Sequence, residues 1–249
     1  MVGGLPSPAT DLIFTACKVK NSKLSIMAEL ILTGAVGRLE ARYNQAESPN
    51  APIALILHPH PKAGGSMQDR VTVMLHKLYV ERGFSTLRFN FRGVGRSQGN
   101  FDNGQGELSD AASALDWLQA QNPVAPMTWV AGYSFGSYIA LQLLMRRPEI
   151  DGFIAVATPA NHYDLSFLAP CPSSGMMFYG SRDQVSPPAD LERSAAKIRT
   201  QKGELVEWEQ IEGADHFYRN ELDTLRDRAA VYLDRRMAEP RKIVPPPRR

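Results

Sequence analysis

The sequence has few cysteines, no long apolar run and no basic leader. The two cysteines, Cys17 and Cys171, cannot form the disulfide framework of a small secreted domain, and they do not cluster as zinc ligands. No stretch of about eighteen apolar residues occurs, so we expect no membrane span. No Lys or Arg precedes the short apolar patch at residues 12–14, whereas a secretory signal peptide needs a basic start. A cytoplasmic location is therefore expected.

The chain also lacks a large excess of charge of either sign, because its formal net charge is +2. Basic residues concentrate at the end, where residues 235–249 contain six Lys or Arg and one Glu, so the rest of the chain is mildly acidic. Such a body offers no broad basic face, and we expect no nucleic-acid partner. We divide the chain into an N-terminal extension (1–26), one domain (27–237) and a flexible basic tail rich in Pro and Arg (238–249).

Short apolar runs alternate with helical patterns through the body of the chain. Residues 53–57, 84–91 and 127–131 are typical of buried strands, and apolar residues recur at helical spacing between them. This alternation predicts an α/β fold with a mainly parallel sheet of about eight strands and helices on both faces. Residues 29–33 and 37–43 have no helix between them, which indicates an antiparallel edge hairpin. In such a sheet, ligands bind beyond the carboxyl ends of the strands.

One short motif links a predicted strand to a predicted helix through a serine. Gly132-Tyr133-Ser134-Phe135-Gly136 has the form G-x-S-x-G, which in this context makes a sharp turn that exposes the serine hydroxyl. The strand and the helix approach so closely that side chains at Gly132 and Gly136 would collide. The helix N-terminus also favours negative charge that develops near the serine. We therefore predict that Ser134 is a nucleophile.

A serine nucleophile needs a base, and the base needs an acid that orients it. Only His162 and His216 follow Ser134 in the chain. On a fold of this kind the order is serine, acid, histidine, and His216 follows Asp183 whereas His162 precedes it. We therefore predict His216 as the base and Asp183 as the acid, each in a loop that leaves a strand. The alternative acids are Asp164, Asp190 and Asp215.

The negative oxygen of an acyl-transfer intermediate needs two backbone N–H donors. One is the residue after the nucleophile, Phe135, and the other lies in the loop after the strand at residues 53–57. That loop reads His58-Pro59-His60-Pro61, and proline has no N–H. The N–H of His60 is the donor that remains, so we predict His60 and Phe135 as the oxyanion donors.

Two other patterns offer competing interpretations. His58 and His60 lie one residue apart on an extended segment and could hold a metal ion in a metal-dependent hydrolase, which would need further ligands. The run Gly93-Val94-Gly95-Arg96-Ser97-Gln98-Gly99 resembles a dinucleotide-binding loop, but its glycine spacing is one residue too long and no strong helix begins there. We interpret that run as a tight structural turn.

With these residues the chain resembles the α/β-hydrolase superfamily over about residues 37–237. The matching pieces are His58-Pro59-His60-Pro61 with Gly64-Gly65, Asn90-Phe91-Arg92-Gly93-Val94-Gly95-Arg96-Ser97, the serine motif, Gly180-Ser181-Arg182-Asp183, and Gly213-Ala214-Asp215-His216. The chain is most similar to small bacterial serine hydrolases related to dienelactone hydrolases and Xaa-Pro-dipeptidyl-peptidase-like domains. It departs from them at Pro59, where most relatives have Gly, and at Asn90, where many have Asp.

The expected function is a serine hydrolase that cleaves a carboxylic ester, a thioester or a similar acyl bond in a small-molecule or acylated substrate, without a cofactor. Residues 158–173 are too few for a cap domain, so we expect a minimal cap and an open site. Within them His162, Tyr163, Phe167 and Leu168 could line the entrance or pack as an ordinary loop. The sequence is also compatible with a peptidase and with a non-catalytic binding protein on the same fold. It is compatible with a homo-oligomer as well.

Overall fold

The computed structural model describes residues 26–199 and 206–239 of the chain. The extension expected at 1–26 and the tail expected at 238–249 lie almost wholly outside these residues, as does Cys17. The strands are β1 (Ile26–Thr33), β2 (Arg38–Gln45), β3 (Ile53–Leu57), β4 (Ser85–Phe89), β5 (Thr128–Tyr133), β6 (Gly152–Val156), β7 (Ser174–Gly180) and β8 (Val206–Ile211). The helices are α1 (Arg70–Glu81), α2 (Gln105–Gln121), α3 (Phe135–Leu144), α4 (Pro188–Arg199) and α5 (Leu222–Ala238), with short 3₁₀ turns η1 (Pro61–Ala63) and η2 (Ser166–Leu168).

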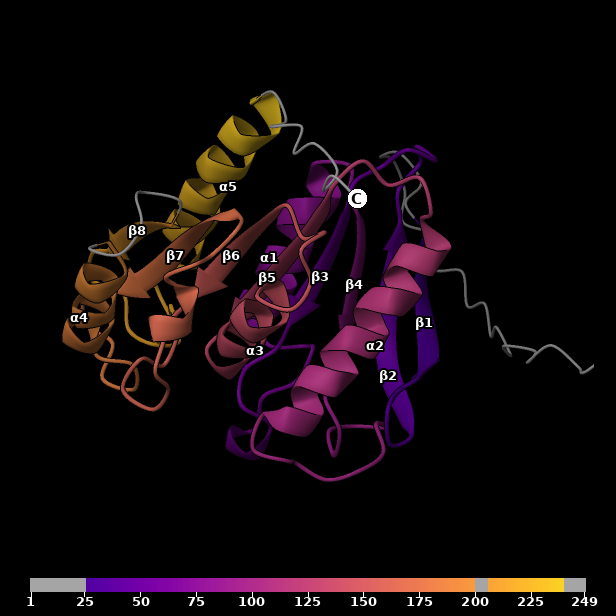
Figure 1. Ribbon diagram of the computed structural model, residues 1–249, viewed down its shortest axis with the longest axis horizontal. Coiled ribbons are helices and arrows are strands. Elements are labelled where there is room, and N and C mark those ends of the chain that lie inside the picture. The colour runs from indigo at the N-terminus through magenta and orange to yellow at the C-terminus, as the bar shows by residue number, and fades with distance from the viewer. Residues whose placement is uncertain (1–25, 200–205, 240–249) are drawn as a thin grey trace, which may run out of the picture.

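The eight strands form one twisted sheet in the order β1-β2-β4-β3-β5-β6-β7-β8 (Figure 1). All pairs from β4 to β8 are parallel. The first two strands form an antiparallel hairpin, and β2 also pairs antiparallel with β4. The mainly parallel sheet and the edge hairpin predicted from the sequence are therefore confirmed.

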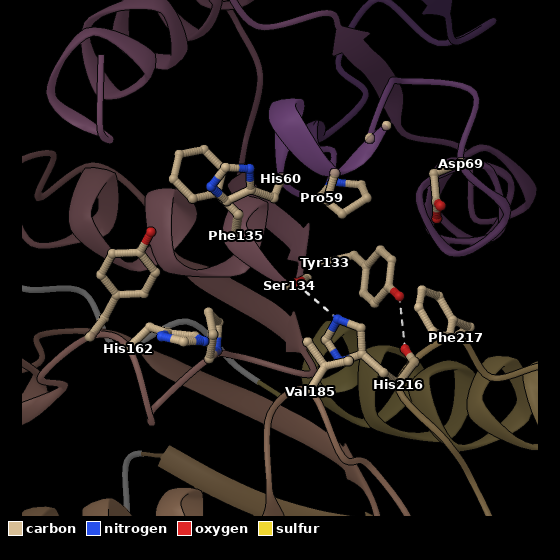
Figure 2. Close-up of a pocket in the computed structure, with 15 residues that line it drawn as sticks. Pro59, His60, Asp69, Tyr133, Ser134, Phe135, His162, Val185, His216 and Phe217 are labelled. Carbon is tan, nitrogen blue, oxygen red and sulfur yellow. Dashed lines mark hydrogen bonds between the residues drawn. The ribbon is translucent and has the colours of Figure 1, made fainter. Parts of the chain in front are cut away.

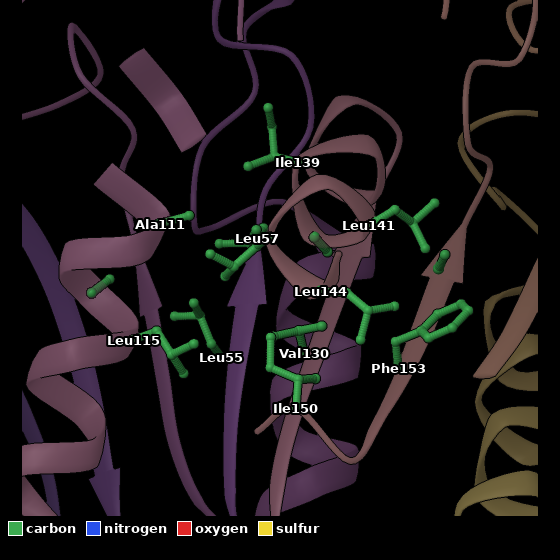
Figure 3. Packing of buried hydrophobic residues seen from close by; sticks show 14 of the residues in the cluster. Leu55, Leu57, Ala111, Leu115, Val130, Ile139, Leu141, Leu144, Ile150 and Phe153 are labelled. Carbon is green, nitrogen blue, oxygen red and sulfur yellow. The ribbon is translucent and has the colours of Figure 1, made fainter. Parts of the chain in front are cut away.

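The sheet is buried on both faces. Successive apolar side chains of its central strands point alternately to the two faces, and helices cover each face. All residues of β3 are buried; Leu55 and Leu57 pack with α2 and α3 on one face, as Figure 3 shows. Ala54 and Ile56 point to the other face, where α1 and α5 cover the sheet. Burying one leucine or isoleucine side chain stabilises the fold by about 1.5–3 kcal/mol, so the central strands contribute to the stability of the fold on both faces of the sheet.

This topology brings several loops together at one edge of the sheet. Because β3, β5, β7 and β8 run parallel, their carboxyl ends meet there, and each leads into a loop that carries a predicted site residue. Between β6 and β7 the chain forms only the three-residue turn η2, so this connection contains no cap domain. Within the described ranges, no helix combines the length and the apolar character needed to cross a bilayer.

Candidate active site

Ser134 lies in the sharp turn between β5 and α3. Its backbone has φ 54° and ψ −121°, a left-handed conformation that costs a non-glycine residue about 1–3 kcal/mol. Glycines on either side leave room for this turn. A Cβ at Gly132 would collide with the Gly136 carbonyl, and a Cβ at Gly136 would collide with the His58 carbonyl. Only glycine at both positions lets the helix approach the strand so closely. The serine is 7% exposed and is the N-cap residue of α3.

Ser134, His216 and Asp183 form one continuous chain of hydrogen bonds. The Ser134 Oγ lies 3.1 Å from Nε2 of His216 (Figure 2). On the other side of the ring, Nδ1 of His216 lies 2.8 Å from Oδ2 of Asp183. An ionised carboxylate only accepts, so the imidazole carries its proton on Nδ1 and leaves Nε2 free to accept from the serine hydroxyl. The Oδ1 of Asp183 accepts the N–H groups of Val185 and Ser186 at 2.9 and 2.7 Å, which hold the carboxylate in place.

The three alternative acids have other partners. Asp164 accepts hydrogen bonds from the backbone N–H and the hydroxyl of Ser166. Asp190 pairs with Arg193, and Asp215 pairs with Arg219. Asp215 adjoins His216 in the chain, but its carboxylate turns to the arginine rather than to the imidazole. Among the four candidates, Asp183 is the one whose carboxylate bonds His216.

Both predicted oxyanion donors lie at the wall of the cavity that contains Ser134. Phe135 is the first residue of α3, and N–H groups in the first turn of a helix have no partner within the helix. The His60 side chain caps η1 by accepting the Lys62 N–H at Nδ1. Its ring packs between Phe101 and Phe135, with ring centres 4.8 and 5.0 Å apart. The loop after β3 is thereby fixed beside the nucleophile.

The cavity around Ser134 has a volume of about 580 Å³. Its walls come from the five segments that follow β3, β5, β6, β7 and β8, and mostly aromatic and small residues line it (Figure 2). Val185 and Phe217 are 44% and 48% exposed at its rim. His162 and Tyr163 line it too, whereas Leu168 is buried in the core and Phe167 packs against Tyr138 instead. The site is therefore an open apolar cleft with the nucleophile at its base.

His58 has no ring nitrogen left for a metal ion. Its Nδ1 bonds the Pro59 carbonyl at 2.7 Å, and its Nε2 accepts the Phe91 N–H at 3.0 Å. Complete burial lowers the pKa of His58 to about 3, so the ring stays neutral. His60 has Nδ1 engaged as well. In the described part of the chain, no group of three or more His, Cys, Asp and Glu side chains has the arrangement of metal ligands.

The glycine-rich run after β4 forms a compact turn against β2. The Val94 N–H bonds the Phe91 carbonyl, and the Ser97 N–H bonds the Val94 carbonyl. The Glu40 carboxylate accepts the Arg96 N–H at 2.9 Å, and a Cβ at Gly95 would collide with that carboxylate. The run is built for a tight turn rather than for wrapping phosphate groups.

Three residues at or beside the cavity escaped the sequence reasoning. Tyr133 donates its hydroxyl to the His216 carbonyl. Asp69 lines the cavity and caps α1 by accepting the Val71 N–H, and burial raises its pKa. Glu107, fully buried, accepts the N–H groups of Asp102 and Gly104, which lie just before α2. The only sequence signals were an Asp before a helix and a Glu near a helix start, which are also common capping patterns.

The sequence matches the X-Pro dipeptidyl-peptidase (S15) family over residues 38–241. The chain belongs to this family. An uncharacterized protein of Rickettsia prowazekii is 46% identical to this S15 family member over 211 residues, which cover 83% of this chain and 89% of that one. Lysophosphatidylserine lipase ABHD12 of Rattus norvegicus is 30% identical over 115 residues, but the match spans 28% of its length and 46% of this chain.

Solved structures extend the comparison. A putative α/β hydrolase of unknown function from Agrobacterium tumefaciens is 54% identical, with a TM-score of 0.81 over 84% of this chain and 96% of that one. An α/β serine hydrolase without lid from Xanthomonas campestris is 31% identical, with a TM-score of 0.75 over 86% and 97% of the two chains. Together with the family match, these similarities identify this S15 family member as a hydrolase with the α/β-hydrolase fold.

Proposed function

We propose that the protein hydrolyses a carboxylic ester, a thioester or a similar acyl bond through an acyl-enzyme on Ser134. The observation that carries this proposal is the unbroken chain of hydrogen bonds from Ser134 through His216 to Asp183. A serine hydroxyl becomes a competent nucleophile at neutral pH only when a base accepts its proton. His216 has that position, and its Nε2 is the nitrogen that faces the hydroxyl.

In the proposed reaction the Ser134 Oγ attacks the acyl carbon while His216 accepts the hydroxyl proton. Asp183 holds the imidazole in the required tautomer and stabilises its charged form. The N–H groups of His60 and Phe135 bind the oxyanion, and each such donor contributes about 2.7–4 kcal/mol in the transition state. His216 then protonates the leaving group, and a water molecule activated by the same imidazole releases the acyl group.

The cavity supports an accessible acyl substrate of small to moderate size. It is open because no cap helix follows β6, and aromatic side chains such as Phe135 and Tyr163 line it. Pockets of about 300–1,000 Å³ accept small-molecule ligands, and the volume here lies within that range. An apolar acyl chain therefore fits better than a highly charged one.

The test is labelling by a fluorophosphonate probe, combined with turnover of p-nitrophenyl butyrate. We expect the wild type to label and to hydrolyse the ester, and Ser134→Ala to do neither. Ser109→Ala on the exposed surface of α2 is the matched control and should behave as the wild type. A folded wild type that does not label would contradict the proposal.

A substrate panel then separates the bond types that the site can cleave. Butyryl thioester and an X-Pro-p-nitroanilide are compared with the p-nitrophenyl ester at equal concentration. We expect kcat/KM to be highest for the ester or the thioester. Preferential cleavage of the X-Pro anilide would instead assign a peptidase activity to the same three residues.

A further inference from the structure

Tyr133 precedes the nucleophile directly and ends strand β5. Its hydroxyl donates a hydrogen bond to the backbone carbonyl of His216, with 2.7 Å between the two oxygens (Figure 2). The two rings also lie against each other, with 5.5 Å between their centres. The residue is only 2% exposed, so water does not compete for this bond. The side chain therefore links the nucleophile turn to the loop that carries the base.

The sheet alone does not fix the distance between the nucleophile and the base. Ser134 follows β5 and His216 follows β8, and β6 and β7 lie between these strands. Through the sheet, the distance from Ser134 to His216 depends on three successive strand pairings. The Tyr133 side chain replaces that long path with a single contact from the residue next to Ser134.

Other bonds of the His216 loop serve a different purpose. The Gly213 N–H donates to the Ser181 hydroxyl at 2.8 Å, and the Arg182 N–H donates to the Ala214 carbonyl at 2.9 Å. Ser181 and Arg182 belong to the loop after β7, which also carries Asp183. These bonds fix the base relative to the acid. The bond from Tyr133 fixes the base relative to the nucleophile.

The Tyr133 hydroxyl keeps its proton, and so stays a donor, at neutral pH. Burial raises its pKa above the ordinary value of a tyrosine, and the nearby carboxylates of Asp69, Asp183 and Asp215 raise it further. The phenol therefore keeps its proton, and the carbonyl of His216 always has a donor to accept.

We propose that Tyr133 is a positioning residue that keeps the His216 imidazole within hydrogen-bond distance of Ser134 by holding the His216 carbonyl. This inference rests on the proposed function of Ser134 and His216. It assigns to the side chain before the serine a role that the G-x-S-x-G pattern itself leaves unspecified, because that position can hold any residue.

The test is Tyr133→Phe, which removes the hydroxyl and keeps the ring. We expect kcat for p-nitrophenyl butyrate to fall about 10–100-fold, since small misplacements of reacting groups cost up to about 10²-fold. KM should stay within about two-fold because the cavity wall keeps its shape. The rate constant of fluorophosphonate labelling should fall by the same factor as kcat, while the final labelled fraction stays that of the wild type.

Tyr79→Phe is the matched control. Tyr79 is fully buried in the same apolar cluster as Tyr133, and among the described residues its hydroxyl has no hydrogen-bond partner. The same chemical change should therefore leave kcat and the labelling rate unchanged. Measuring Tm for both variants separates a loss of folding from a loss of positioning.

The outcomes distinguish this inference from the function on which it rests. A wild type that does not label would overturn both. A labelled wild type with a Tyr133→Phe variant that keeps kcat within about two-fold would overturn the positioning role alone. A variant whose final labelled fraction falls with its Tm, while the remaining active molecules react at the wild-type rate, would also overturn it.

Discussion

Two buried histidines follow strands at the same edge of the sheet, His58 after β3 and His216 after β8. The ring nitrogens of His58 bond backbone groups, the Pro59 carbonyl and the Phe91 N–H. Those of His216 face a carboxylate on one side and a serine hydroxyl on the other. The first ring joins two loops, whereas the second lies on a path along which a proton can move.

The comparison shows that the partners of an imidazole, rather than its place after a strand, decide its chemistry. His58 cannot take up a second proton near neutral pH, because burial lowers its pKa to about 3 and both ring nitrogens already bond backbone groups. His216 bonds a carboxylate, which in the proposed mechanism stabilises the ring when it accepts the proton of Ser134. Variants of the two histidines should therefore affect different measurements.

The largest expected effect comes from exchanging each histidine for alanine. His216→Ala should lower kcat by about 10⁶-fold, as expected when a member of a cooperating set is removed. His58→Ala should lower the free energy of unfolding instead, because it leaves the buried Phe91 N–H without its partner, at about 1–3 kcal/mol, and removes the bond to the half-buried Pro59 carbonyl. Ester turnover and urea denaturation measure the two effects. A folded His58→Ala variant without turnover would break the comparison.

Asp183→Asn sharpens the account of His216. The amide oxygen can still accept the N–H groups of Val185 and Ser186, so the loop should keep its shape. The amide nitrogen would then face Nδ1 of His216 and favour the wrong tautomer. We expect kcat to fall by about 10⁴-fold with little change in Tm. A decrease of less than about ten-fold in steady-state turnover would remove Asp183 from the mechanism.

The pH dependence of stability should follow the neutral histidines. Burial lowers the pKa of both His58 and His76 to about 3, whereas the unfolded chain binds these protons near the ordinary value of about 6.5. Their contribution is therefore complete above about pH 6.5 and is lost as the pH falls toward 3. Each histidine should lower the free energy of unfolding by about 1.4 kcal/mol for each unit by which the pH falls in that window. Urea denaturation between pH 7 and 4.5 checks this, and His58→Ala should show a shallower slope than the wild type.

The smallest expected effect lies at the rim of the cavity. Val185 is 44% exposed there, and it contacts Asp183 through its backbone N–H, which a substitution keeps. Val185→Ser should raise KM for p-nitrophenyl butyrate about two- to three-fold by removing apolar contact, and leave kcat unchanged. Steady-state kinetics over a series of acyl chain lengths measure this, and an equal loss in kcat would place Val185 closer to the reaction than the account allows.

The sequence was sufficient for the layers of the fold because its central strands are apolar on both faces. The run at residues 53–57 became β3 with the predicted bounds, and the run at 127–131 became β5, shifted to Thr128–Tyr133. Both strands were predictable because each contains a run of apolar residues that is evident in the sequence alone. Ser134, Asp183 and His216 could also be predicted. The serine motif identifies the first, and the order serine, acid, histidine expected for the fold selects the other two.

The contacts that cross the sheet edge were beyond the sequence. Nothing in the sequence near Tyr133 indicates that its hydroxyl bonds a carbonyl in a loop 83 residues later. The full engagement of His58 was hidden for the same reason, because its partner Phe91 comes from the loop after another strand. Such contacts depend on how loops pack together, and spacing along the chain does not encode them.

The most direct test of the central claim is to locate the covalent adduct. Wild-type protein is treated with a fluorophosphonate and digested, and the modified peptide is sequenced by mass spectrometry. The account predicts one phosphonyl group per chain, on the Oγ of Ser134, formed with loss of fluoride. An adduct on another residue, or none on folded protein, would contradict the assignment of Ser134 as the nucleophile activated by His216.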